Sequence, residues 1–172
     1  IILFNPSKLI CLDISEYNLF NLKNELLNYI KNNQLNFKIS FKLVSINNFQ
    51  QINDIFAKEN INIVFHAAAY KHVDLIEHNV IPAIETNIFG FINVISLSLK
   101  YKVNKFLFVS TDKAVRPTSI MGFTKRFSEI YIQYLNHNKK NENTTLAAVR
   151  FGNVFGSAGS VIELFNNQIS NK

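Results

Sequence analysis

Cysteine, tryptophan, glycine and proline are all scarce in this 172-residue chain, which has one cysteine, no tryptophan, five glycines and three prolines. A single cysteine, Cys11, cannot form a disulfide within the chain, which suits a reducing compartment. The low glycine and proline contents exclude a collagen-like or low-complexity protein. Because hydrophobic residues make up 48% of the chain and charged residues only 17%, the composition predicts a soluble globular domain with a buried core.

Long apolar runs are also missing. No run reaches the ~20 residues that a membrane span requires, and no signal peptide is evident, so we expect no membrane segment and a cytoplasmic location. The net charge of +6 comes from scattered lysines, of which only Lys139 and Lys140 are adjacent, so we predict no nucleic-acid partner. The histidines lack the spacing of metal ligands, so we predict no metal site.

Short apolar runs alternate with segments of helical periodicity. The runs predict strands at 8–14, 37–44, 61–66, 105–110 and 145–151. The periodic segments predict helices from Ser15 to about 30, at 49–59, in two pieces broken near Pro82 that end near 100, and at 120–138. This alternation predicts one α/β domain over 1–172, with a doubly wound, Rossmann-like parallel sheet and helices on both faces.

The glycine-rich turn of a dinucleotide-binding fold is not found. Such a fold begins with a strand followed at once by closely spaced glycines, whereas Gly152, Gly156 and Gly159 come late and read as turn glycines. We therefore expect the domain to lack its first strand and glycine turn, and also a C-terminal substrate lobe. We expect the chain alone to be inactive and poorly stable, because an internal strand is left uncovered.

Every candidate ligand-binding group follows a predicted strand, and ligands of parallel sheets gather at the carboxyl ends of strands. Asp13 can accept hydrogen bonds from an adenine ribose and repel a 2′-phosphate, which favours NAD over NADP, although a loop acid or cap is the alternative. Ser15 caps the next helix and is placed with Asp13 among the cofactor-binding residues. The small turn Ala67, Ala68 and Ala69 lets a flat cofactor approach the backbone, unless it only permits close packing.

A second group of polar residues surrounds the start of the last predicted helix. Asp112 can act as an acid or base, and Lys113 can do so if its pKa is lowered. Lys125 can reach a nicotinamide ribose, and Ser110 can bind a sugar hydroxyl. Met121, one helical turn before Lys125, carries no exchangeable proton. The alternative interpretation is a capped helix start after a charged loop.

Four motifs together resemble one family. They are 65–73 (FHAAAYKHV), 110–115 (STDKAV), 121–126 (MGFTKR) and 149–154 (VRFGNV). They are similar to the capsule-type nucleotide-sugar 4,6-dehydratases, which belong to the extended short-chain dehydrogenase/reductases of bacterial polysaccharide biosynthesis. The likeness runs through essentially the whole chain. Methionine at position 121, where the family usually has tyrosine, resembles its larger, membrane-anchored branch, so a longer parent chain could be anchored at the cytoplasmic face of a membrane.

The resemblance implies a lyase that acts on UDP-N-acetylglucosamine with tightly held NAD, or NADP. A hydride leaves C4 of the sugar, water is eliminated across C5–C6, and the hydride returns at C6 to give a 4-keto-6-deoxy sugar. It also implies that a homo-oligomer could form through two long helices.

The resemblance assigns roles residue by residue. Asp112 would exchange a proton with the C6 oxygen and, with methionine at 121, is the natural base for the C4 hydroxyl. Lys113 would handle the C5 proton, Ser110 or Thr111 would hold the C4 oxygen, and Lys125 the nicotinamide ribose. The remaining assignments are Lys71 and Asn87 at the cofactor, and His72 and Asn153 at the substrate.

Two other interpretations stay open. An epimerase or a C5-inverting dehydratase would share the first oxidation and differ in the sugar product. From another class, a degenerate remnant would bind nucleotide without catalysis. The missing glycine turn favours the remnant, whereas the intact Ser110–Lys113 segment and Lys125 favour the enzyme.

Overall fold

The computed structural model describes residues 1–4, 6–138, 143–152 and 154. The strands are β1 (Lys8–Asp13), β2 (Lys38–Leu43), β3 (Ile63–His66), β4 (Lys105–Thr111) and β5 (Thr145–Phe151). The α-helices are α1 (Glu16–Asn32), α2 (Phe49–Lys58), α3 (Val73–Glu77), α4 (Val80–Ile84), α5 (Phe91–Lys100) and α6 (Ile120–His137). Short 3₁₀ turns at Ile2–Phe4 and Asp112–Ala114, and a π-helical segment at Glu85–Gly90, complete the order. The predicted strands and helices are confirmed to within about two residues at most ends.

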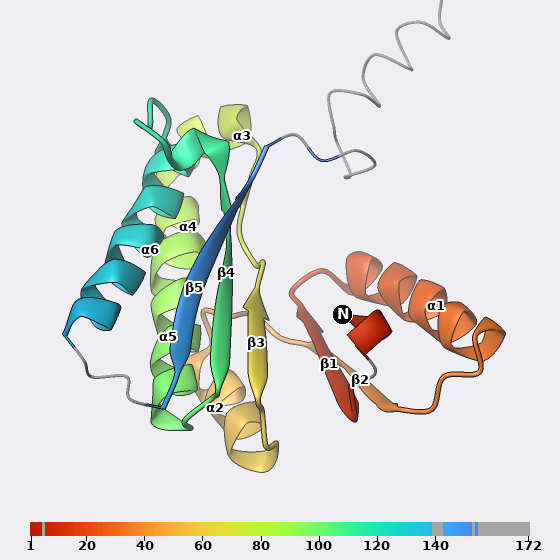
Figure 1. The fold of residues 1–172 in the computed structure, drawn as a ribbon. Helices are drawn as coiled ribbons and strands as arrows, with labels where there is room; N and C mark the ends of the chain where they lie inside the picture. Colours follow the sequence, from red (N-terminus) through yellow and green to blue (C-terminus); the bar gives the residue numbers. More distant parts are fainter. Residues whose placement is uncertain (5, 139–142, 153, 155–172) are drawn as a thin grey trace, which may run out of the picture.

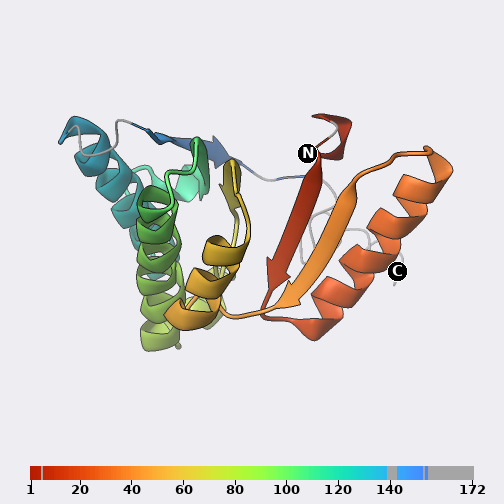
Figure 2. The ribbon, with the colours of Figure 1, turned by 90° about the horizontal axis from the view of Figure 1, so that it is seen from below.

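The strands form two parallel sheets. β1 pairs with β2, from Lys8 opposite Lys38 to Asp13 opposite Leu43. β4 lies between β3 and β5 in the second sheet, with Lys105 opposite both Ile63 and Thr145. Figure 2 shows β1 and β3 facing each other across a gap, and the described residues hold no strand that pairs with both edges. The parallel α/β fold is thus confirmed, with its sheet interrupted between β1 and β3.

Helices cover both sides of this arrangement, as a doubly wound fold requires. α1 packs on the β1–β2 sheet, and α2, α5 and α6 lie on the opposite side, against the β3–β4–β5 sheet (Figures 1 and 2). Each of the two long outer helices begins at a serine whose hydroxyl accepts a backbone N–H: Ser15 from Asn18, and Ser119 from Gly122. Serine is favoured at this position because it satisfies an otherwise unpaired donor of the first turn.

The main core lies between the three-stranded sheet and α5. Alternate side chains of β4 are buried, so Phe106 and Phe108 point toward the helices and are each 1% exposed. The fully buried Phe91 of α5 packs edge-on against Phe108, with ring centroids 5.1 Å apart. Burial of each such ring stabilises the fold by roughly 1.5–3 kcal/mol. Leu12 and Val44 extend from the smaller sheet to the same core and so join the two sheets.

One helical stretch of the described residues, Val80–Lys100, is long and apolar enough to cross a membrane. Its apolar character has a second explanation, because Val94, Ile95 and Leu97 belong to the main core. The predicted break near Pro82 falls instead between α3 and α4. Pro82 lies in the first turn of α4, where a proline costs no helical hydrogen bond.

Candidate active site

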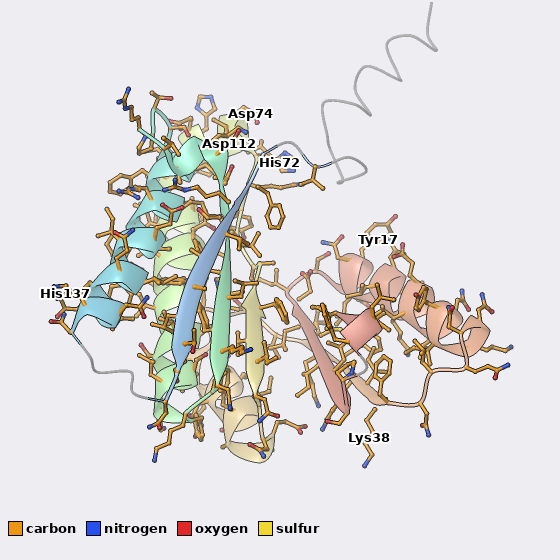
Figure 3. The ribbon with its side chains drawn as sticks, viewed as in Figure 1. Tyr17, Lys38, His72, Asp74, Asp112 and His137 are labelled. Carbon is orange, nitrogen blue, oxygen red and sulfur yellow. The ribbon has the colours of Figure 1, made fainter. Side chains whose placement is uncertain are left out.

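Asp13, the loop 67–72 and the segment 110–113 lie at the carboxyl ends of strands, as expected, whereas Asn87, Met121 and Lys125 lie on helical segments. β4 ends at Thr111 and runs directly into the 3₁₀ turn that holds Asp112 and Lys113. In Figure 3, Asp112 and His72 lie at the same end of the three-stranded sheet, whereas His137 is at the far end of α6. His72 is exposed and precedes the first turn of α3 without capping it through its side chain. Asn153 lies outside the described residues.

Asp13 and Ser15 sit at the end of the other sheet, across the gap from this group. An Asp13 carboxylate oxygen accepts the backbone N–H of Ser15 at 2.7 Å, which fixes the turn between β1 and α1. The Ser15 hydroxyl is used by the helix cap. Both side chains therefore make hydrogen bonds that stabilise the local turn and helix start. The second carboxylate oxygen of Asp13 can still accept a hydrogen bond from a ligand.

Thr111, Asp112 and Lys113 form a small hydrogen-bonded cluster. The Thr111 hydroxyl donates to Asp112 Oδ1 at 2.9 Å, and Lys113 Nζ lies 3.3 Å from the same oxygen. The hydrogen bonds from Thr111 and Lys113 lower the pKa of the Asp112 carboxyl below its usual range. Asp112 and Lys113 side chains are 58% and 46% exposed. At neutral pH the turn therefore presents an accessible carboxylate, which can act as a base, beside the Lys113 side chain.

Gly122 lets α6 approach this turn. A Cβ atom at that position would lie 2.4 Å from the main-chain oxygen of Lys113, a contact that no side chain can make. Because the obstacle is backbone, it cannot rotate away. The first turn of α6 and the Asp112–Ala114 turn are therefore in direct contact, a constraint that the sequence reading did not identify.

Met121 is buried, 4% exposed, and packs with Ile76 and Ala83 in a second, smaller core. Its side chain thus fills the space between α6 and the α3–α4 pair. The structure gives methionine at this position a packing role in addition to the loss of an exchangeable proton. That another group must handle protons here stays a prediction.

Lys125 is turned into the protein. Its Nζ donates to the Val109 carbonyl oxygen at 2.9 Å and lies 4.7 Å from the ring centre of Phe108. Burial lowers the pKa of Lys125 to about 8. To contact a nicotinamide ribose as predicted, Lys125 Nζ would have to leave the Val109 carbonyl oxygen or hydrogen-bond to this oxygen and the ribose at the same time.

Asn87 holds the loop after β3. Its Oδ1 accepts the Tyr70 N–H at 2.8 Å, and its Nδ2 donates to the Tyr70 carbonyl at 3.0 Å and to the Thr124 hydroxyl at 3.1 Å. The π-helical turn Glu85–Gly90 carries Asn87, and such turns often occur at functional sites. Asn87 therefore fixes the position of the loop, whose Ala67 and Ala68 are exposed, Ala69 is half-buried and Lys71 is exposed.

Ser110 is separated from its neighbours in the motif. It is 4% exposed, on the helix side of β4, and its hydroxyl donates to Glu129 at 2.7 Å. Of the two candidates for the sugar C4 oxygen, only Thr111 lies in the turn with Asp112. Glu129 was missed in the sequence, since nothing near it in the chain shows which strands it meets.

His66, the last residue of β3, lies in the core. It is 4% exposed and stacks on Phe106 and Phe108, with centroids 5.9 and 5.8 Å away. Burial, and then the charge of Lys125, lowers the pKa of His66 to about 3. Its Nε2 has no hydrogen-bond partner in the described part of the chain. His66 is therefore a neutral, core histidine.

The parallel strands, with helices on both sides and a polar cluster at their carboxyl ends, define a Rossmann-like domain. The chain belongs to a family described as polysaccharide biosynthesis proteins, whose pattern matches residues 1–172. It is 42% identical over 168 residues to the capsular polysaccharide biosynthesis protein CapD of Staphylococcus aureus, covering 96% of this chain and 27% of that protein. It is 41% identical over 133 residues to a UDP-glucose 4-epimerase of Rickettsia canadensis, covering 77% and 38% of the two chains.

Solved structures agree with the fold. The X-ray structure of Pen from Bacillus thuringiensis matches with a TM-score of 0.84 and 40% identity, over 97% of this chain and 48% of that one. The dTDP-glucose 4,6-dehydratase DesIV of Streptomyces venezuelae matches with a TM-score of 0.77 over 96% of this chain and 53% of that one, and its 17% identity shows the fold alone. The chain spans less than half the length of the curated relatives named above.

Proposed function

We propose that this chain carries the proton-handling part of a nucleotide-sugar 4,6-dehydratase, with UDP-N-acetylglucosamine as substrate and NAD as cofactor. The observation that carries the proposal is the cluster of Thr111, Asp112 and Lys113, beside a helix whose Met121 cannot transfer a proton. Removal of a hydroxyl proton requires a base near the reacting carbon, and the Asp112 carboxylate is ionised and accessible.

The residues present fit a nicotinamide cofactor in part. Asp13 supplies a carboxylate at the end of β1, and the exposed Ala67 and Ala68 leave the backbone after β3 open to a flat ring. The donors that would bind the cofactor's diphosphate are not among the described residues. When bound, the nicotinamide would take a hydride from C4 of the sugar and return it at C6. The charged Lys125 amine would donate a hydrogen bond to a hydroxyl of the nicotinamide ribose.

In the proposed reaction, Asp112 and Lys113 carry out the proton transfers. Asp112 takes the proton of the C4 hydroxyl while Thr111 holds that oxygen, and the resulting ketone acidifies the C5 proton. In its neutral amine form, Lys113 would remove the C5 proton and return it to C5 when the hydride adds at C6. Asp112, now protonated, returns its proton to the departing C6 oxygen as water leaves. Proton balance is kept because the acid of the elimination is the base of the oxidation. Exposed His72 contacts the sugar nucleotide.

Replacement of Asp112 by asparagine tests this assignment. In the full-length gene product, D112N should lower turnover of UDP-N-acetylglucosamine by ~10²–10⁴-fold, the usual contribution of a positioned acid or base, while NAD binding is retained. Turnover is followed by NMR of the sugar product and NAD binding by fluorescence. Activity of D112N within a few-fold of the natural protein would contradict the proposal. M121Y is a second arm, in which we expect no large gain.

An epimerase is the second candidate function, favoured by the identity of about 40% to proteins named UDP-glucose 4-epimerase. It would use the same base for the C4 hydroxyl and return the hydride to C4. A product that keeps its C6 hydroxyl, identified by NMR, would select the epimerase. We further propose a cytoplasmic location; one relative, from Methanocaldococcus jannaschii, is named as a membrane protein.

A further inference from the structure

Glu129 of α6 is a buried carboxylate that the proposed chemistry does not use. It is 4% exposed and accepts four hydrogen bonds. Ser110 donates at 2.7 Å, Arg150 donates from Nε and Nη2 at 2.8 and 2.7 Å, and Arg126 donates at 3.0 Å. Four hydrogen bonds satisfy most of the acceptor capacity of a carboxylate, so the group is held in one place.

Two of the partners of Glu129, Ser110 and Arg150, belong to the ends of adjacent strands. Ser110 is the residue before Thr111 in β4, and it lies opposite Arg150 in the register with β5. Glu129 contacts both from α6, so one carboxylate joins two strands and a helix just below the catalytic turn. Arg150 binds with two parallel N–H groups, a geometry that fixes direction as well as distance.

The charge of Glu129 also fixes the Ser110 hydroxyl. Burial alone would raise the pKa of Glu129, but hydrogen bonds from Arg150, Ser110 and Arg126 outweigh it and lower the pKa to about 2. An ionised carboxylate can only accept, so the single hydroxyl proton of Ser110 is committed to it. Ser110, the second-to-last residue of β4, is thereby held at its side chain as well as its backbone.

We propose that Glu129 is a positioning residue, which holds the ends of β4 and β5 together through Ser110 and Arg150 and so sets the placement of Thr111 and Asp112. Its meaning for catalysis rests on the proposed function. The structural part of the proposal, that Glu129 orders the Asp112–Ala114 turn, is independent of the proposed function, because the order of that turn can be measured without a substrate.

Stability alone is the competing explanation, and the chain offers a control that separates the two. Apolar residues of similar volume can replace a buried ion pair without loss of stability. The double variant E129M/R150M should therefore recover the stability that E129Q loses, but it leaves Ser110 without its acceptor. A positioning role predicts that the turn stays loosened in the double variant, and a purely structural role predicts that the turn recovers with the stability.

Hydrogen–deuterium exchange of the full-length gene product gives the first test. The reporters are the Lys113 N–H, bonded to the Thr111 hydroxyl, and the Val115 N–H, bonded to the Asp112 carbonyl. In E129Q and in E129M/R150M we expect these amides to exchange ~10-fold faster or more, the scale of one lost charge-assisted hydrogen bond, with β1 and β2 unchanged. Natural exchange at the turn in the double variant would overturn the proposal. If E129Q fails to fold, S110A takes its place.

Kinetics of the full-length gene product give the second test. We expect kcat to fall ~30-fold or more in E129Q and E129M/R150M, with KM for the UDP-sugar within ~3-fold, because a misplaced base affects the chemical step more than binding. A double variant with natural kcat would overturn the positioning role. A natural protein without dehydratase activity would refute the proposed function, and the exchange experiment would still decide the role of Glu129.

Discussion

Replacement of His66 by phenylalanine should make the protein more resistant to acid. His66 is 4% exposed among Phe91, Phe106 and Phe108, and its folded-state pKa is lowered to about 3 from 6.5. Below pH 6.5 the unfolded chain binds a proton at this residue and the folded chain does not. The stability present above pH 6.5 is therefore lost as the pH falls toward 3. Phenylalanine keeps the ring stacking and removes the titration.

The size of the effect follows from the pKa difference. Each pH unit between the two pKa values changes stability by about 1.36 kcal/mol, so the natural protein should lose about 2–3 kcal/mol between pH 6.5 and 4.5 through this residue alone. Glu129, whose pKa is lowered from 4.5 to about 2, loses its contribution only below this window. For a domain of ordinary stability, the expected loss is a large part of the total.

Urea unfolding at pH 7.0, 6.5, 5.5 and 4.5 measures the difference between natural protein and H66F. The difference in free energy of unfolding should shift by about 2–3 kcal/mol in favour of H66F across the series. H137Q, a change at the exposed end of α6, is the matched control and should keep the natural pH dependence. Parallel pH curves for H66F and the natural protein would refute a neutral buried histidine at position 66.

Three further predictions concern α6, the sheet edge and Lys125. G122A should destabilise the protein by about 1–3 kcal/mol in urea unfolding, despite the better helix propensity of alanine, because its Cβ would meet the Lys113 oxygen at 2.4 Å; an unchanged or higher stability would contradict this contact. I63K lies at the edge of β3 that no described strand pairs with, and it should reduce self-association in sedimentation experiments because charges at a strand edge oppose strand pairing. I130K, at an equally exposed position on α6, is the control and should leave self-association unchanged. Equal effects of the two variants would contradict association through the edge of β3. K125M should abolish the rise in stability between pH 8 and 10.5, where the unfolded chain still holds a proton that folded Lys125 has lost; a persistent rise would contradict the buried amine.

The order of strands and helices could be predicted because each element has a strong local signal. β4 is a short apolar run in the sequence, and serines cap the first turns of α1 and α6. The π-helical turn at Glu85–Gly90 could not be predicted, because its extra residue is set by packing of Asn87 against the loop at Tyr70. Nor does a local pattern give the interruption between β1 and β3, since each strand finds a partner on its other side.

The geometry of the candidate site could be predicted where its residues are neighbours in the chain. Thr111, Asp112 and Lys113 form a cluster because one turn holds them, so the motif and the geometry coincide. Ser110 belongs to the same motif, but strand alternation turns its side chain to the opposite face, toward Glu129. Lys125 and His66 depart from simple expectation for the same reason: burial, which depends on distant packing, determines their state.

The interrupted sheet has a consequence for folding cooperativity. Among the described residues, β1, α1 and β2 form a unit from consecutive residues, and no hydrogen-bonded ladder joins it to the β3–β4–β5 unit. The two units are coupled by side-chain packing, in which Leu12 and Val44 contact the shared core. Asp13 belongs to one unit and Asp112 to the other, so a ligand that contacts both must also bring the two into fixed register. The free energy required to order the two units then reduces the affinity for the ligand. In turn, the bound ligand couples the two units, so that they unfold together.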